Sequence, residues 1–276
     1  MNKVKYNDGI HIISNNEYHA SEGISRSMLM EFKRSPYHYW YKYVSGLAEK
    51  EDATPAMNLG SAVHTLVLEE HQFDNEFHVI HQLTRPRKNT PAHEKMMADA
   101  QGKIILSNDE YLQAAQMALA VKNSNEAQAL LQGCLVEQSI YFTHEKTGLQ
   151  IKARPDAMAG SLVIDLKTTS DASKHAFQSS AVRYGYFLQS AIINEALKAI
   201  NNPMEHFVFI SVENKKPYCV AIDMVDGESI EHSVKQFDEL MIGLAKCMDS
   251  NIWPGYGVRD LMIPKYAMQD EILEIE

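Results

Sequence analysis

The first half of the chain repeats its apolar residues with the spacing of amphipathic helices. A serine at position 25 or 27 suits a helix N-cap ahead of Met28 and Leu29, and Pro36 interrupts the pattern. Leu59 and Val63 belong to a second apolar stripe. Residues 81–103 are polar and contain prolines, which predicts a surface loop that runs into a short helix. We expect helices at residues 25–35, 58–70, 108–123 and 125–132.

From Glu137 onward the apolar period changes to two, which is the spacing of a β-strand. Turn signals at "EKTG" and "MAGS" divide residues 137–168 into three strands, and this predicts an antiparallel meander. The rest of the pattern predicts helices at 172–181, 184–200 and 226–249 and strands at 206–214 and 218–224. The expected fold class is therefore α/β, with a central mixed β-sheet and an antiparallel meander flanked by helices.

We find no internal repeat and no low-complexity linker, so the sequence predicts a single domain. Residues 1–135 are expected to form a mainly helical N-terminal part and residues 136–256 the core. Residues 257–276 are expected to form a C-terminal tail, which is acidic.

The composition is that of a soluble globule, because the 276 residues are 45% hydrophobic and 22% charged. Three cysteines lie far apart without a CxxC pair, which argues against a disulfide framework or a zinc ribbon and fits a reducing compartment. The sequence shows neither a secretory h-region nor a run of apolar residues long enough to span a membrane. We therefore expect a cytoplasmic protein with no membrane contact.

The formal net charge of −10 makes nucleic acid a less expected partner, since neutralising phosphates requires Lys and Arg. A local cationic groove can nevertheless coexist with an acidic exterior, and carboxylates that hold metal ions add to the negative total. Net charge alone therefore does not decide the class of partner.

The stretch "IKARPDAMAGSLVIDLKTTS", residues 151–170, places charged groups at alternate positions. Lys152, Arg154 and Asp156 share one side of the second meander strand, and Asp165 and Lys167 share one side of the third. A solvent-facing sheet also alternates polar with apolar residues. Here "LVIDLK" is apolar apart from its aspartate and lysine, so we expect this strand to be buried on both faces. Burial of those charges is costly unless something pairs them.

A divalent cation would pair these carboxylates. Mg²⁺ prefers carboxylate oxygen and water, and it binds one or two protein carboxylates together with a substrate phosphate. Asp156 and Asp165 on adjoining strands can hold such an ion, and Lys167 can contact the water that the ion polarises. These residues predict metal-assisted hydrolysis of a phosphodiester.

The motif "RPDA", with a second aspartate nine residues after the first in "DLK", resembles the core of the PD-(D/E)xK nuclease superfamily. The resemblance implies a restriction-endonuclease-like core in which Asp156, Asp165 and Lys167 are catalytic. Lys167 would orient or deprotonate the attacking water, or neutralise the charge that develops on the phosphate. We also expect Arg154, which shares a side with Asp156, and Thr168 to contact the DNA backbone.

Further motifs resemble the RecB-like and RecE-like branch of this superfamily. "GSAVH" is similar to its Gly-x-x-x-His helix, which implies that His64 is a metal ligand together with both aspartates. "VEQSIYF" places Glu137 where the branch has an acidic ligand. "YGYFLQ" resembles its Tyr/Gln helix, so Tyr186 and Gln189 would contact the substrate phosphate or support the catalytic groups. Each of these residues taken alone also fits an ordinary surface or strand-end position.

The motif order and the "SPYHYW" segment are most similar to RecE-type exonucleases, or exonuclease VIII, which are typical of prophages. This resemblance implies a Mg²⁺-dependent 5′→3′ exonuclease that acts on linear double-stranded DNA, with Mn²⁺ as a substitute ion. It also implies a ring-shaped homo-oligomer and a RecT-like single-strand annealing protein as partner. The alternatives are a nuclease of other polarity or substrate, a non-catalytic DNA-end-binding protein, and a hydrolase of a small phosphodiester.

Overall fold

The computed structural model of the protein describes residues 3–49, 52–80, 86–87 and 89–263. The largest sheet among these residues is mixed, as the sequence predicts. Strands β8 and β9 are parallel, and the other neighbouring strands of this sheet are antiparallel. Its strands, in spatial order, are β10 (Val220–Met224), β9 (His206–Glu213), β8 (Leu162–Thr169), β7 (Ala157–Ala159) and β4 (Leu135–Val136).

The continuous meander predicted for residues 137–168 is wrong in one respect, because its second strand is divided. β6 (Gln150–Ala153) pairs with β5 (Ser139–Thr143) and belongs to a separate antiparallel sheet with β1 (Gly9–His11). The chain then passes into β7 of the large sheet. The break falls at Pro155, which has no backbone N–H to donate to a strand partner. Asp156 therefore lies where the chain crosses from one sheet to the other.

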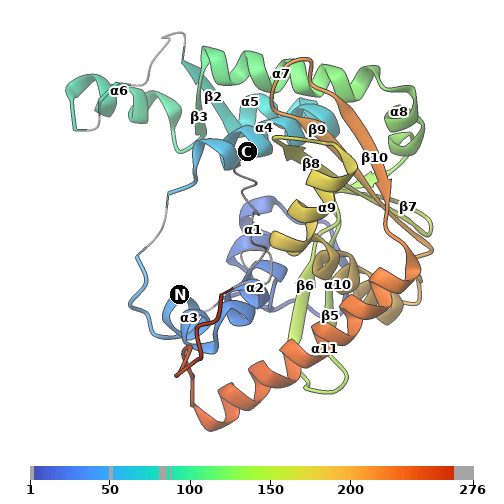
Figure 1. The fold of residues 1–276 in the computed structure, drawn as a ribbon. Coiled ribbons are helices and arrows are strands. Elements are labelled where there is room, and N and C mark those ends of the chain that lie inside the picture. Colours follow the sequence, from blue (N-terminus) through green and yellow to red (C-terminus); the bar gives the residue numbers. More distant parts are fainter. Residues whose placement is uncertain (1–2, 50–51, 81–85, 88, 264–276) are drawn as a thin grey trace, which may run out of the picture.

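Helices cover both faces of the large sheet (Figure 1). α4 (Pro55–Leu68) and α7 (Asn108–Asn123) pack on the face that carries Ile164 and Leu166 of β8. α10 (Tyr186–Ala199) and α11 (Gly227–Ser250) share the other apolar core with β5 and β6. Because Ile164, Asp165 and Leu166 are all buried, the prediction that this strand is covered on both sides is confirmed.

The N-terminal part is mainly helical, as predicted, and its first predicted helix ends just before Pro36. The helices here are α1 (Asn15–Ala20), α2 (Arg26–Arg34), α3 (Pro36–Tyr39) and the π-helical turn Trp40–Val44. Further along the chain are the 3-10 turn Glu70–Gln72, α5 (Phe73–Glu76), α6 (Pro91–Ala100), α8 (Asn125–Leu131) and α9 (Lys174–Arg183). Within the described part of the chain, no helix combines the length and apolarity needed to cross a membrane.

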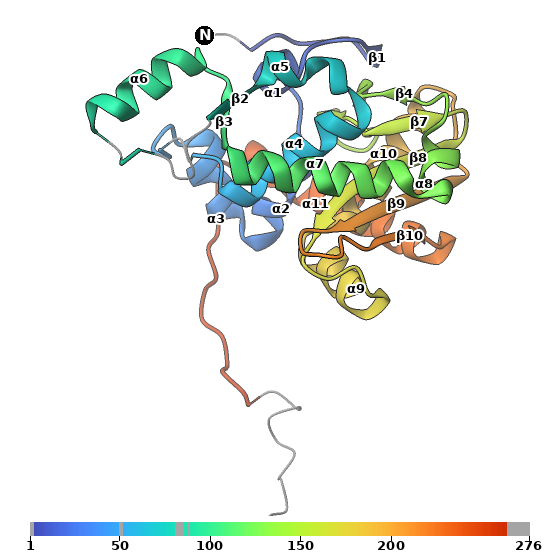
Figure 2. The same ribbon diagram turned by 90° about the horizontal axis from the view of Figure 1, so that it is seen from above.

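The polar segment predicted as a loop and short helix does contain a helix, α6, which projects from the body of the molecule (Figure 2). The sequence pattern missed the parallel pair of short strands that flank it, β2 (Phe77–Ile80) and β3 (Ile104–Ser107). Residues 81–85 and 88 of this segment, and residues 264–276 of the predicted tail, lie outside the described residues.

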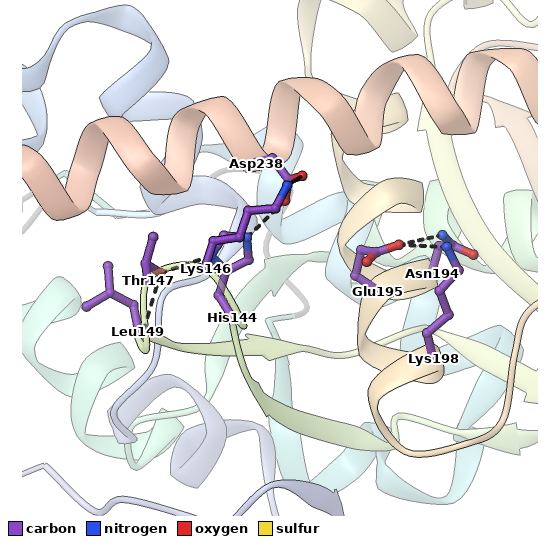
Figure 3. Close-up of polar contacts among 8 residues, drawn as sticks. All are labelled: His144, Lys146, Thr147, Leu149, Asn194, Glu195, Lys198 and Asp238. Carbon is purple, nitrogen blue, oxygen red and sulfur yellow. Dashed lines mark hydrogen bonds and ion pairs between the residues drawn. The ribbon is translucent and has the colours of Figure 1, made fainter.

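The turn between β5 and β6 is fastened to α11 by a polar cluster (Figure 3). The buried His144 is hydrogen-bonded to Thr147 Oγ1 through Nδ1 and to Asp238 Oδ1 through Nε2, each at 2.9 Å. Lys146 Nζ donates to the other oxygen of Asp238 at 2.5 Å. Burial opposes ionisation of Asp238, but the hydrogen bonds from Lys146 and His144 outweigh it and hold the pKa of this carboxyl below its usual value.

Candidate functional site

Asp165 and Lys167 of β8 meet two side chains of α10. Asp165 is fully buried; it forms an ion pair with Lys167 and accepts a hydrogen bond of 2.5 Å from Gln189 Nε2. Lys167 Nζ lies 5.0 Å from the centre of the Tyr186 ring. Burial, reinforced by the charge of Asp156, raises the pKa of Asp165, and Lys167 opposes this rise. The structure thus brings these four predicted residues together around one buried carboxylate.

His64, Glu137 and Asp156 form a second group beside the first. Their candidate ligand atoms all lie within 4.8 Å of one another, and His64 Nδ1 is 3.4 Å from Asp156 Oδ2. The same oxygen of Asp156 accepts a hydrogen bond of 2.7 Å from the backbone N–H of Leu166. This group contains three of the four predicted metal ligands. The fourth, Asp165, contacts Lys167 and Gln189, and its role as a metal ligand stays a prediction.

Glu137 reaches the group through an unusual backbone conformation. Its φ of +52° lies in the left-handed region, and its N–H donates to the carbonyl of Asp156 at 3.1 Å. Non-glycine residues held in this region are often found at functional sites. Burial raises the pKa of Glu137 to about 8; Asp156 adds to this rise and Arg154 opposes it.

Arg154 and Lys152 turn toward α1 instead of following Asp156. The Arg154 side chain is only 8% exposed and donates to Ser139 Oγ and to the N-terminal segment. Lys152 Nζ donates to the carbonyls of Tyr18 and Ser21 at the end of α1. The Arg154 guanidinium is therefore engaged by protein acceptors. Its contact with the DNA backbone stays a prediction.

Thr168 lies at the end of β8, under α4. A Cβ placed on Gly60 would come within 3.4 Å of the Thr168 hydroxyl, so the helix approaches the strand closely at this point. The absence of a side chain at Gly60 helps to place His64, one turn further along α4, near Asp156. Thr168 is partly buried, and its role as a DNA contact stays a prediction.

Two cavities flank these residues. A cavity of about 560 Å³ reaches His64 and Glu137, and its wall includes the carboxylates of Glu69 and Glu76. Another of about 290 Å³ reaches Gln189 and Arg154; its other basic wall residues are Lys3, His19, Arg26 and Lys152. The first wall, which also contains Lys103, lies on the side of the candidate metal ligands, and the basic wall lies on the side of α2 and β6.

Sequence reasoning missed the contribution of residues 14–16, which line the larger cavity. A signal for the helix was present, since Ser14 and Glu17 have the spacing of a capping box and form one in the structure. No local pattern, however, indicates that this short helix packs beside the predicted metal ligands.

The converging group suits a divalent cation. It offers an imidazole nitrogen and two carboxylates from three separate segments, and it borders an open cavity that leaves room for water and substrate. Carboxylates and water suit Mg²⁺ and Mn²⁺, and an imidazole is a common ligand of transition metals. His64, Glu137 and Asp156 would hold the ion.

Comparison with known families gives a match over most of the chain. The model of a "PDDEXK-like domain of unknown function (DUF3799)" matches residues 25–261. A comparison with curated proteins gives no match.

Solved structures show a similar fold. A protein from Eubacterium rectale named "Putative exonuclease" has a TM-score of 0.67 at 14% identity, covering 92% of this chain and 96% of its own. A phage-related exonuclease from Haemophilus somnus 129PT has a TM-score of 0.33 at 13% identity, covering 61% and 91%. The alkaline exonuclease LHK-Exo from Laribacter hongkongensis has a TM-score of 0.25 at 13% identity, covering 60% and 87%. Only the first of these scores is high enough to bear on the fold.

Proposed function

Because the chain belongs to the PDDEXK-like family, which confirms the superfamily predicted from its motifs, we propose that it is a metal-dependent exodeoxyribonuclease. Its substrate would be linear double-stranded DNA, degraded from 5′ to 3′ with Mg²⁺, or Mn²⁺ in its place. The observation that carries this proposal is the adjacency of two groups: Asp165, Lys167 and Gln189 beside the convergent donors of His64, Glu137 and Asp156.

Each side chain has a defined task in this proposal. When bound, the divalent ion supplies Lewis acidity and lowers the pKa of a water. His64, Glu137 and Asp156 hold the ion, and the buried Asp165 keeps Lys167 in place through their ion pair. Lys167 orients or deprotonates the attacking water, or neutralises charge on the phosphate. Tyr186 and Gln189 keep Lys167 and Asp165 aligned from α10.

The biological setting rests on the sequence resemblance to RecE-type exonucleases. It includes DNA ends generated for single-strand annealing recombination, a RecT-like annealing partner, a ring-shaped homo-oligomer and a prophage origin. It also includes a cytoplasmic location. A basic cavity wall beside Gln189 supports an anionic substrate despite the net charge of −10.

One assay tests polarity and reaction class together. Linear duplex DNA carrying a 5′ label or a 3′ label is incubated with Mg²⁺ or with EDTA, and a closed circle of the same sequence serves as a second substrate. We expect the 5′ label to be released first, only with Mg²⁺, and the circle to stay intact. Cleavage of the circle would favour an endonuclease, and DNA-end binding without nucleotide release would favour a non-catalytic protein.

Lys167→Met tests the mechanism in the same assay. It should abolish digestion while leaving the circular dichroism spectrum unchanged, because its carbon chain still fills the site. Lys198→Met is the matched control, since Lys198 is also ion-paired with a carboxylate, Glu195, but lies at the exposed end of α10. Full activity in a folded Lys167→Met protein would contradict the assigned role of Lys167.

A further inference from the structure

A short segment ahead of the region matched by the family model contributes to the candidate metal group. The match begins at residue 25, whereas Ile13, Asn15 and Tyr18 contact Arg154 directly. We propose that Arg154 is a positioning residue that holds Glu137 in the metal group, and that residues 13–18 lock Arg154 in place. This inference rests on the proposed function, because the metal group is the one assigned there.

The contacts of Arg154 leave its side chain little freedom. One terminal nitrogen donates to the carbonyl of Ile13, and the other lies 3.3 Å from Asn15 Oδ1. The guanidinium carbon lies 4.9 Å from the centre of the Tyr18 ring, which adds a cation–π contact. A guanidinium is a rigid planar fork, so fixing both ends fixes the direction of its remaining N–H group.

That remaining N–H group donates to Ser139 and brings the guanidinium charge close to Glu137. Arg154 Nε donates to Ser139 Oγ at 3.0 Å and lies 3.6 Å from Glu137 Oε2. Glu137 needs such a partner, because its carboxylate faces the like charge of Asp156 and its backbone occupies the left-handed region. A fixed positive group on the outer side of Glu137 opposes the repulsion that would turn the carboxylate away from Asp156.

The segment that locks Arg154 is itself anchored independently of it. The capping box of Ser14 and Glu17 fixes the start of α1. Lys152 Nζ donates to the carbonyls of Tyr18 at 2.7 Å and Ser21 at 2.9 Å, near the end of the helix. β1, just before α1, pairs with β5. Arg154 is thus held by a preformed structure, as an outer partner of a metal ligand needs to be.

The test measures Mn²⁺ binding to the full chain, with free Mn²⁺ followed by electron paramagnetic resonance. Loss of an outer partner of a metal ligand typically weakens metal binding by about 10- to 100-fold. Arg154→Lys keeps the charge but cannot make the same set of contacts, so we expect the Kd for Mn²⁺ to rise at least about 10-fold. Asn15→Ala should cause a smaller rise. Glu22→Ala, at an exposed position of the same N-terminal stretch, should leave the Kd unchanged.

A double-mutant cycle separates positioning from general damage. Glu137→Ala weakens binding by itself, and adding Arg154→Lys should then have no further effect, because Arg154 acts through Glu137. A penalty for Arg154→Lys that persists without Glu137 would overturn the proposal, as would an unchanged Kd in a folded Arg154→Lys protein. If Arg154→Lys does not fold, the Kd for Mn²⁺ is measured for Asn15→Ala with and without Glu137→Ala, and the same two outcomes decide. A wild-type chain that binds no Mn²⁺ would contradict the proposed function itself.

Discussion

Gly185 precedes α10, the helix that carries Tyr186 and Gln189. Replacing Gly185 by alanine tests how closely the start of α10 packs against α2. Its backbone has φ of +69°, and a Cβ added there would lie 2.4 Å from Met30 Sδ on α2. Gly148, in the turn between β5 and β6, has the same φ of +69°, yet an added Cβ would meet nothing within 4 Å. Gly148→Ala is therefore a matched control with the same backbone strain and no collision.

The two substitutions should differ by a measurable amount. An L-residue in the left-handed region costs about 1–2 kcal/mol, which applies to both sites. Overpacking typically adds about 1–3 kcal/mol, and Met30 is flexible and partly buried, so we take the lower end. We expect Gly185→Ala to lose about 2–3 kcal/mol of unfolding free energy and Gly148→Ala about 1–2 kcal/mol.

Urea unfolding followed by circular dichroism measures both values. In a Met30→Ala background the difference between the two glycine variants should disappear, because the collision partner has been removed. Gly185→Ala should also reduce nuclease activity, since the start of α10 sets the position of Gln189 against Asp165. Equal destabilisation of the two variants in the wild-type background would refute the reasoning.

Three other changes test the polar supports. Gln189→Ala removes the donor to the buried Asp165 carboxylate, and urea unfolding should show a loss of about 1.5–3 kcal/mol; no loss would mean that Lys167 alone suffices. Lys152→Met leaves the carbonyls at the end of α1 without this donor and should cost about 1–3 kcal/mol in the same measurement. The lowered pKa of Asp238 means that its carboxylate stabilises the fold above the ordinary carboxyl pKa, and this contribution is lost as the pH falls through the lower folded-state value. Asp238→Asn should therefore melt below the wild type near neutral pH, and the difference should shrink in acid; a difference independent of pH would exclude this linkage.

Much of the fold follows from local patterns. The period of two around Asp165, the helical spacing before and after it, and the proline at position 36 each predict an element that the structure contains. The pattern failed where pairing depends on distant partners. β2 and β3 are too short to show a period, and their parallel pairing joins segments on either side of α6. Pro155 was visible in the sequence, but the transfer of the chain to another sheet was not.

In the candidate site, too, local contacts could be predicted from the sequence, and contacts between distant segments could not. Asp165 and Lys167 lie two apart on a strand, so their shared face could be predicted from alternation. The meeting of His64 with Asp156 requires α4 to pack on the large sheet, and only the family resemblance indicated it. The direction of the Arg154 side chain could not be predicted. Strand alternation places Arg154 on the same side as Asp156 only if the strand is continuous, and it breaks at Pro155. Its acceptors Ile13 and Asn15 lie about 140 residues away in sequence.

The crossing of the chain between the two sheets also bears on the stability of the folded protein. A cation bound by His64, Glu137 and Asp156 would cross-link α4, the connection between β4 and β5, and the crossing between the two sheets. Such a cross-link would close long loops of the chain. Binding only to the folded state adds RT ln(1 + [L]/Kd), or about 2.7 kcal/mol at a hundredfold excess over Kd. The temperature of unfolding would therefore rise with the free concentration of the ion.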